Sequence, residues 1–465
     1  MIDRRLVVCT LALVACSDDD PAGSGGGSSS ASSGAPATTK SATTGTGSTT
    51  STGSAAAGGG GGAGGSTPSY TASTSIITSD HRFIDGQMFG GWGPHLGHSI
   101  DAGANGLWFV DDVCAQPGIS GLSPCDVNDD HTLGWYRRDG GAWSLVTTAS
   151  IPGAVQQNTA TISSADGATL FTFGLDVAAG SIIECAFDLP AGPPTCGALP
   201  FPLVPSSNYI GAAISPDGYR VVWWTGVVDG GGGSFHYIVD YGGGWNGPRS
   251  GGAAGYNDAS YIGIGFPTDA PARFVMHVQL VSGLAPAWSF FGGMGTGDLT
   301  TSDPVTFSLP LAPVTGDDPV VSTNDVWVDP ASQDEHVIAR TEAGRAAYYH
   351  RPPQGSWSGP LFSLDATYRA RFVAHGDRMA LVYGPNGSGL AFRVATAADL
   401  PTGSPIDWAA LEETPIPLPA GYDSIYAIYP AGAPYQVVPG SNIEIAVVGA
   451  ERQYEVLGVS LALTR

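Results

Sequence analysis

Short hydrophobic runs, separated every few residues by Gly, Pro, Asn or Asp, fill the chain from Ile76 to its C-terminus. The runs are either fully apolar or alternate apolar with polar residues, which is typical of strands joined by tight turns. An amphipathic helical pattern of ten or more residues does not occur, and Asp407–Glu413 would form at most two helical turns. The pattern therefore predicts an all-β fold for residues 76–465.

A tryptophan hairpin recurs along this region. An aromatic strand turns through glycines into a strand that begins with tryptophan, as at Trp143, Trp245 and Trp357. Together with the string Gly91-Trp92-Gly93-Pro94, these tryptophans are separated by one or two steps of about 51 to 56 residues. A period of this length is typical of a repeat architecture.

A second pair of strands keeps the same period. A strand of small residues precedes a strand of bulky ones, as in Gly211–Ile214 and Val221–Trp224. Small residues suit strands crowded around an axis, and four strands in about 50 residues make one blade of a β-propeller. We expect seven blades, with six or eight as alternatives, and a ring closed by Ser75–Met88 beside Tyr454–Leu463. A pair of long β-sandwiches or a β-solenoid is the alternative fold.

The first residues have the pattern of an export signal. Arg4 and Arg5 precede Leu6–Ala15, an apolar run of ten residues, about half the length that a transmembrane helix needs. The run ends in Leu13-Val14-Ala15-Cys16, which resembles the lipobox of bacterial lipoproteins. The resemblance implies that residues 1–15 are a signal peptide and that Cys16 becomes the lipidated first residue. An ordinary secretory signal with an incidental cysteine is the alternative.

Residues 16–75 consist mostly of Gly, Ser, Ala and Thr. Such a segment cannot bury enough apolar area to offset its chain entropy, so we expect a disordered tether with a span of about 40 Å. Ser17 follows the cysteine in place of the aspartate of the usual inner-membrane retention signal. We therefore expect an exported, lipid-anchored protein at the outer membrane or the cell surface.

Charge narrows the range of partners. The net charge is −23, and Lys40 is the single lysine of the chain. Nucleic acid is excluded because phosphate binding needs a basic stripe. Anionic lipid headgroups are disfavoured for the same reason, so the anchor is the expected contact with a membrane. A protein or a glycan remains as the expected ligand.

Four cysteines form two pairs with the same spacing. Cys114 and Cys125 are eleven residues apart, and so are Cys185 and Cys196. In an oxidising compartment this spacing predicts two local disulfides, Cys114–Cys125 and Cys185–Cys196. A four-thiolate metal site is the alternative, but no Cys-x-x-Cys spacing supports it.

One loop region carries the candidate ligand-binding residues. In a propeller blade, the loop entering the first strand and the loop joining the second and third strands lie on the same face, which would bring Gly93–His98 near Asp111–His131. The candidate ligand-binding residues there are His95, His98, Asp111 and Asp112. The two histidines would suit zinc, but the sequence offers no obvious third ligand.

The same loop contains a possible calcium motif. Asp126, Asn128 and Asp130 alternate as the oxygen ligands of a calcium loop do. His131 occupies the position where such a loop has glycine, and no suitably spaced glutamate follows. A solvated acidic loop is the alternative. Calcium is therefore a candidate cofactor, and no other cofactor is expected.

The tryptophan hairpins resemble the repeats of bacterial neuraminidase-like and Asp-box propellers and of fucose-binding propeller lectins. Ser215–Gly218 resembles the turn of TolB-type and WD-type propellers, but Tyr219 stands where the Asp-box has glycine. The likeness to lectins implies that Trp143, Trp245 and Trp357 are sugar platforms, and packing between blades is the alternative.

Catalytic motifs are lacking. The chain contains neither Gly-x-Ser-x-Gly nor His-Glu-x-x-His, and the sialidase signature Phe-Arg-Ile-Pro does not occur. We therefore expect a binding module for protein or glycan without catalytic activity. A carbohydrate-active hydrolase or lyase, with carboxylates converging on the propeller channel, is the alternative function.

Overall fold

The computed structural model describes residues 49–50, 69–81, 97–113, 131–151, 159–430 and 442–464, apart from short loops within 159–430. These residues form strands, turns and short 3-10 segments, among them η1 (Gly103–Asn105). None of them belongs to a helix long and apolar enough to cross a membrane. At Asp407–Glu413 the chain makes turns, in which Ala410 N–H donates to Asp407 O over 3.1 Å.

The described strands form one five-stranded sheet and six four-stranded sheets. The five-stranded sheet contains β1 (Thr49–Thr50), β2 (Ser69–Thr78), β29 (Arg452–Thr464), β28 (Ile443–Gly449) and β27 (Ile425–Pro430). The next sheet contains β3 (Gly97–Asp101), β4 (Leu107–Val113), β5 (His131–Asp139) and β6 (Ala142–Ile151). It is followed by β7 (Thr159–Ser163), β8 (Thr169–Asp176), β9 (Ser181–Asp188) and β10 (Thr195–Pro202).

The remaining four sheets follow in chain order. The first contains β11 (Asn208–Ile214), β12 (Arg220–Val228), β13 (Gly232–Asp240) and β14 (Trp245–Gly252). The second contains β15 (Asp258–Gly265), β16 (Arg273–Ser282), β17 (Ser289–Asp298) and β18 (Thr306–Ser308). The third contains β19 (Val320–Val328), β20 (Glu335–Thr341), β21 (Ala346–Arg351) and β22 (Ser358–Leu364). The fourth contains β23 (Arg371–His375), β24 (Arg378–Tyr383), β25 (Leu390–Ala395) and β26 (Thr414–Ile416).

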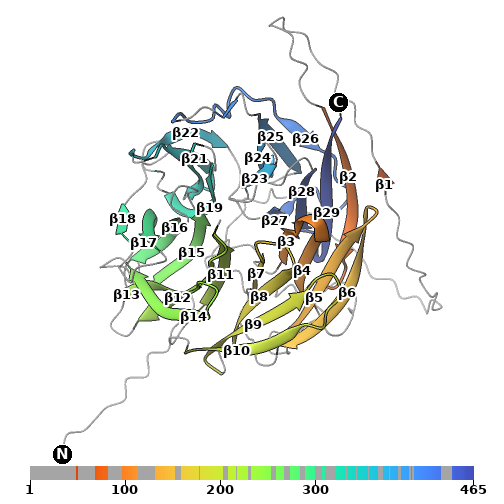
Figure 1. The fold of residues 1–465 in the computed structure, drawn as a ribbon. Helices are drawn as coiled ribbons and strands as arrows, with labels where there is room; N and C mark the ends of the chain where they lie inside the picture. The colour runs from red at the N-terminus through yellow and green to blue at the C-terminus, as the bar shows by residue number, and fades with distance from the viewer. Residues whose placement is uncertain are drawn as a thin grey trace, which may run out of the picture.

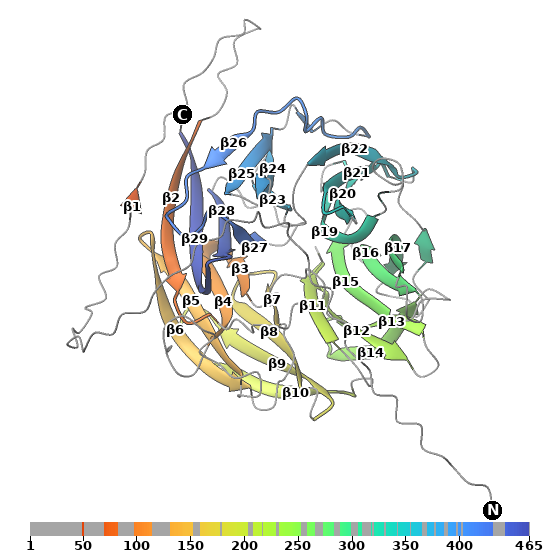
Figure 2. The ribbon, with the colours of Figure 1, turned by 180° about the vertical axis from the view of Figure 1, so that it is seen from behind.

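The sheets surround a common axis, with the first strand of each four-stranded sheet innermost and the last one outermost (Figures 1 and 2). Every strand pairing is antiparallel in these four-stranded sheets, as in a meander. The chain is therefore an all-β β-propeller, as its repeats predicted, and the number of sheets lies within the expected range of six to eight.

The ring is closed by the two ends of the folded region. β2 pairs with β29 from Ser69↔Thr464 to Thr78↔Val456. The expected closing segment, Ser75–Met88, overlaps this strand at Ser75–Thr78 only. The strand starts earlier, at Ser69, although its first residues are mostly small and polar like those of the tether. Tyr70 packs edge-on against Phe392 there, with ring centroids 5.2 Å apart.

Large side chains fill the space between neighbouring sheets. Between the β3–β6 and β7–β10 sheets, Phe187 contacts Trp108 and Trp135, with ring centroids 5.5 and 5.6 Å apart. The disulfide Cys185–Cys196 is present, and it joins directly paired residues of β9 and β10. Cys114 and Cys125 lie outside the described residues, so their disulfide stays a prediction.

Candidate functional site

The candidate ligand-binding residues divide into described and undescribed ones. On β3, Gly97 pairs with Asp111 of β4, and His98 pairs with Val110. The backbone around His98 therefore lies beside Asp111. The following candidates lie outside the described residues: Cys16, His95, Asp126, Asn128 and Asp130. The lipidation site and the calcium loop therefore remain predictions, and no group of three or more possible metal ligands occurs among the residues that are described.

Asp111 is bonded to a histidine that the sequence analysis did not single out. His81 Nδ1 lies 2.8 and 2.9 Å from the two carboxylate oxygens of Asp111, and both side chains are fully buried. Burial raises the pKa of Asp111, although the neighbouring His81 opposes this rise. His81 also donates its backbone N–H to Tyr454 O over 3.0 Å and forms a bridge with Val113, so the pair lies between β29 and the end of β4. Asp112 is fully buried too.

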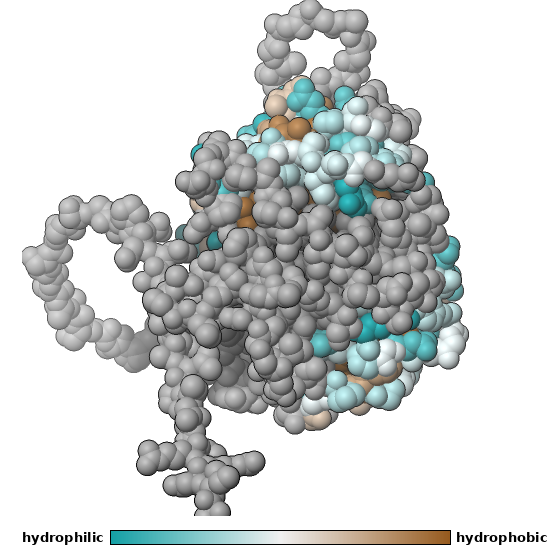
Figure 3. Space-filling model, turned by 90° about the vertical axis from the view of Figure 1, so that its left-hand side faces the viewer, coloured by the Kyte–Doolittle hydropathy of each residue, from teal (hydrophilic) through white to brown (hydrophobic). Residues whose placement is uncertain are grey.

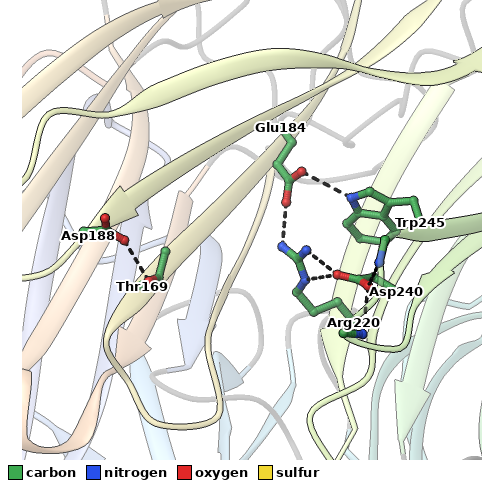
Figure 4. Close-up of polar contacts among 8 residues, drawn as sticks. Thr169, Glu184, Asp188, Arg220, Asp240 and Trp245 are labelled. Atoms are coloured by element: carbon green, nitrogen blue, oxygen red, sulfur yellow. Dashed lines mark hydrogen bonds and ion pairs between the residues drawn. The ribbon is translucent and has the colours of Figure 1, made fainter.

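A second charged cluster lies partly exposed at the seam between the β7–β10 and β11–β14 sheets (Figure 4). Arg220 begins β12 and pairs across the sheet with Asp240, which ends β13. The glycine turn that follows returns the chain so that Trp245, the first residue of β14, pairs with Asp240. Glu184 reaches the cluster from β9 of the neighbouring sheet. We call Glu184, Arg220, Asp240 and Trp245 the Arg220 cluster.

Hydrogen bonds fix the Arg220 guanidinium from two sides. Arg220 Nη1 donates to Glu184 Oε1 over 2.6 Å, while Nη2 and Nε donate to Asp240 Oδ2 over 2.5 and 3.2 Å. Trp245 Nε1 donates to the other oxygen of Glu184, Oε2, over 3.2 Å. The carboxylate of Glu184 thus joins the arginine and the tryptophan of the next sheet, as Figure 4 shows.

Aromatic rings hold the same guanidinium. Arg220 Cζ lies 4.1 Å from the ring centroid of Phe171 and 4.8 Å from that of Trp245. Phe173 meets the Trp245 ring edge-on, with centroids 5.7 Å apart. A planar cation between two aromatic faces gains cation–π attraction and loses rotational freedom. The donor atoms of Arg220 are therefore held in one place before any ligand arrives.

Hydrogen bonds from the glycine turn contribute to keeping Asp240 deprotonated. Its Oδ1 accepts the N–H groups of Gly242 and Gly244 over 2.8 and 3.0 Å. Burial alone would raise the pKa of Asp240, but the hydrogen bonds from Arg220, Gly244 and Gly242 outweigh burial and lower it. Asp240 is consequently a carboxylate at neutral pH and balances the charge of Arg220.

The Arg220 cluster remains accessible at its edge. The side chains of Arg220 and Glu184 are 17% and 18% exposed, and that of Asp240 is 8% exposed. At the same end of the β11–β14 sheet, Arg249 Nη2 donates to Tyr241 OH over 2.6 Å, and Tyr219 meets Tyr241 edge-on. Tyr219 and Tyr241 adjoin Arg220 and Asp240 in sequence and therefore face the other side of the sheet. The Arg220 cluster itself combines hydrogen-bonding groups with the rings of Phe171 and Trp245, an arrangement that suits a ligand with hydroxyl groups and an apolar face.

The other tryptophan hairpins share part of this arrangement. Arg351 lies over Trp357, with Cζ 5.0 Å from the ring centroid, and is ion-paired to Glu335 of its own sheet. Trp143 is partly buried against Ile77 of the preceding sheet. Trp357 is also partly buried, in the core of its own sheet. Packing thus accounts for much of the repeat, while Trp245 also bonds a carboxylate of the preceding sheet.

Exposed large hydrophobic side chains are few among the described residues: Ile76, Leu145, Val146, Leu361 and Tyr454. All but Leu361 lie on β2, β6 and β29, away from the Arg220 cluster. On the face drawn in Figure 3, the described hydrophobic residues form small areas among hydrophilic ones. The Arg220 cluster therefore differs from an apolar docking surface in its charges and hydrogen bonds.

Comparison with known proteins gives a fold and no family. No family model matches the sequence, and no curated protein matches it. Among solved structures, the BP39L lectin from Burkholderia pseudomallei is similar at 12% identity, with a TM-score of 0.52 over 80% of this chain and 97% of the lectin. The polysaccharide lyase Uly1 is similar at 10% identity, with a TM-score of 0.48 over 84% of this chain and 98% of the lyase. A Dyadobacter fermentans protein of unknown function is 13% identical, with a TM-score of 0.46 over 66% of this chain and 94% of its own.

Proposed function

We propose that the propeller is a binding module without catalytic activity, and that it binds a glycan at the Arg220 cluster. The observation that carries this proposal is the guanidinium of Arg220, which is held between Phe171 and Trp245 and bonded to Glu184 while part of it stays exposed. Preorganised charged donors and acceptors beside an aromatic ring bind a polyhydroxylated ring with little entropic cost. The fold shared with a lectin is compatible with this role, but fold alone does not establish it.

Each member of the cluster has a separate role in this proposal. The outer edges of Glu184 and Arg220 bond neighbouring hydroxyl groups, and Trp245 contacts the apolar face of the sugar ring. Asp240 positions Arg220 through its two hydrogen bonds. Glu184 and Asp240 are both paired with the arginine, so neither is suited to donate a proton to a glycosidic oxygen.

A glycan array identifies the ligand and tests the site. The full chain is screened with calcium and with chelator, and the best glycan is then titrated by calorimetry. We expect Glu184→Gln to weaken binding at least tenfold, because it removes a charged acceptor from the ligand. Glu444→Gln is the matched control, since Glu444 pairs with Arg138 over 2.7 Å at a different seam. Equal binding by the two variants would exclude the Arg220 cluster, and a blank array would favour a protein ligand.

We also propose that Cys16 is acylated and that the tether holds the propeller outside the cytoplasm, at the outer membrane or the cell surface. The support is the string Leu13-Val14-Ala15-Cys16 after an apolar run of ten residues. Metabolic labelling with an alkyne fatty acid should mark the wild-type protein and leave Cys16→Ser unmarked. Labelling of both proteins to the same extent would contradict the proposal.

A further inference from the structure

Two buried histidines face each other at the seam between the β19–β22 and β23–β26 sheets. His336 of β20 and His350 of β21 are directly paired residues, 2% and 1% exposed, with ring centroids 5.2 Å apart. Trp327 of β19 lies opposite His336, with its ring centroid 4.8 Å away. These side chains share the face that packs on the β23–β26 sheet, because Trp327 and Tyr348 belong to the same core cluster as Phe372 and Trp408.

The connection between β25 and β26 is fastened to this histidine pair. Gly403 N–H donates to Asp334 Oδ2 over 2.7 Å, and Ile406 N–H donates to Tyr348 OH over 3.1 Å. Both acceptors contact a histidine: Tyr348 OH lies 2.7 Å from His336 Nδ1, and Asp334 Oδ1 lies 3.5 Å from His350 Nε2. Residues 403–408 are therefore bonded to Tyr348 and Asp334, which each contact a histidine and are exposed to a change in its charge.

A neutral His336 suits the hydrogen bonds and the burial of this seam. Tyr348 OH accepts the Ile406 N–H and lies 2.7 Å from His336 Nδ1, so it can donate its own proton to an unprotonated Nδ1. A proton on Nδ1 removes this acceptor and forces the Tyr348 hydroxyl to redirect its own proton. A positive His336 would also repel a positive His350 across 5.2 Å between ring centroids.

The surrounding charged groups are engaged elsewhere. Asp325 of β19 accepts Phe372 N–H over 2.9 Å, and Glu335 is ion-paired to Arg351. Asp329 accepts the Ser332 hydroxyl over 2.7 Å, while Arg393 of the adjoining sheet bonds Tyr383 and Glu413. Arg371 and Arg378 are the other charged side chains described on β23 and β24, and Arg371 acts on Asp325. The anion in contact with His350 is Asp334.

We propose that this seam is an acid-labile latch, in which proton uptake by His336 releases residues 403–408 from Tyr348 and Asp334 and loosens the β23–β26 sheet from the β19–β22 sheet. The latch is independent of the glycan site, which lies at another seam. Burial supports it, because burial and the neighbouring His350 lower the pKa of His336 well below its usual value. Burial lowers the pKa of His350 as well, although Asp334 opposes this change. The folded protein therefore resists protonation here until the latch opens.

Hydrogen exchange at pH 7.5 and 5.0 tests the latch in the full chain. After correction for intrinsic exchange rates, we expect the amides of Gly403 and Ile406 to lose protection at least tenfold at pH 5.0. The amide of Leu189, which donates to Ala168 O over 2.8 Å in another sheet, is the internal reference and should keep its protection. Unchanged protection of Gly403 and Ile406 relative to Leu189 would overturn the proposal. This measurement is made on the wild-type protein and requires no variant.

Two variants separate the latch from general acid sensitivity. His336→Gln keeps an acceptor for the Tyr348 hydroxyl but cannot take up the proton, so its amide protection at residues 403–408 should no longer depend on pH. His236→Gln is the matched control, since His236 is also buried and stacks on Trp224 at 5.7 Å in the β11–β14 sheet, at a different seam. If His336→Gln retained the acid effect, the histidine would not be the sensor. Tyr348→Phe should release Ile406 at both pH values.

Discussion

Replacing Arg220 by alanine should destabilise the propeller more than the loss of an ordinary surface arginine. The substitution removes the cation that Glu184 and Asp240 share, and it removes a guanidinium packed between Phe171 and Trp245. Asp240 retains the two amide donors of the glycine turn, and Glu184 retains the indole N–H of Trp245. The carboxylates are thus deprived of their counter-charge, although each keeps a hydrogen bond.

The size of the effect follows from burial. Removing one partner of a fully buried ion pair costs about 3–5 kcal/mol, because an uncompensated charge stays buried. Arg220 and Glu184 are 17% and 18% exposed, so solvent screens part of this cost. Adding about 1 kcal/mol for the cation–π contacts, we expect the free energy of unfolding to fall by about 3 kcal/mol.

Urea unfolding followed by tryptophan fluorescence measures the difference. Arg452→Ala is the control, since Arg452 is 42% exposed and Glu455, which it faces over 3.3 Å, keeps its hydrogen bond from Tyr422; this loss should not exceed about 1 kcal/mol. A loss below about 1 kcal/mol in Arg220→Ala, with an unchanged m-value, would refute the view that the cluster joins the two sheets. The double variant Glu184→Gln with Arg220→Met should recover part of the loss, because it leaves fewer unpaired charges.

Three further predictions concern stability. Relative to His336→Gln, the wild-type protein should lose stability as the pH falls below about 6.5, by at most ~1.4 kcal/mol per pH unit. The reason is that the lowered pKa of His336 lets the unfolded chain take up the proton before the folded one does. If the free energies of unfolding of both proteins, measured in urea, changed equally with pH, this prediction would be contradicted. Replacing Cys185 and Cys196 by serine should cost about 2–4 kcal/mol, and an unchanged midpoint of thermal unfolding would count against it. Gly359→Ala should lower the free energy of unfolding by about 1–3 kcal/mol, because the φ of 143° at Gly359 disfavours any side chain and a Cβ would lie 3.0 Å from Tyr348 O. Gly243 has open space around it, so Gly243→Ala should match the wild type in the same unfolding assay.

The propeller fold could be predicted from the sequence because its repeats have local residue patterns that recur at a fixed spacing. The spacing of Trp143, Trp245 and Trp357 reflects a hairpin that every copy must form, and the small and bulky strands reflect their distance from the axis. The closing strand was predicted too late in the chain, because Ser69–Ser75 has the composition of the tether and its β29 partners lie almost four hundred positions later. Composition cannot reveal a partner at that separation.

The charged sites were harder to find than the fold. Trp245 was singled out by its repeat, but Glu184 and Arg220 are 36 residues apart on different sheets and belong to no motif. His81 likewise carried no sequence signal, since its partner Asp111 is 30 residues away. The packing of neighbouring strands and sheets brings such residues together, and no local pattern in a single sequence shows how these elements will be aligned.

The pairing of β2 with β29 determines the order in which this molecule can be completed. A ribosome makes β2 among the first folded residues and β29 among the last, so the ring cannot close before nearly the whole domain has been synthesised. Contacts of such long sequence separation form slowly. Until then β2 presents ten residues of unpaired edge, which is open to strands of other molecules. A chain that stops before Arg452 would keep this edge unpaired, so we expect such truncated chains to aggregate more readily than the complete domain.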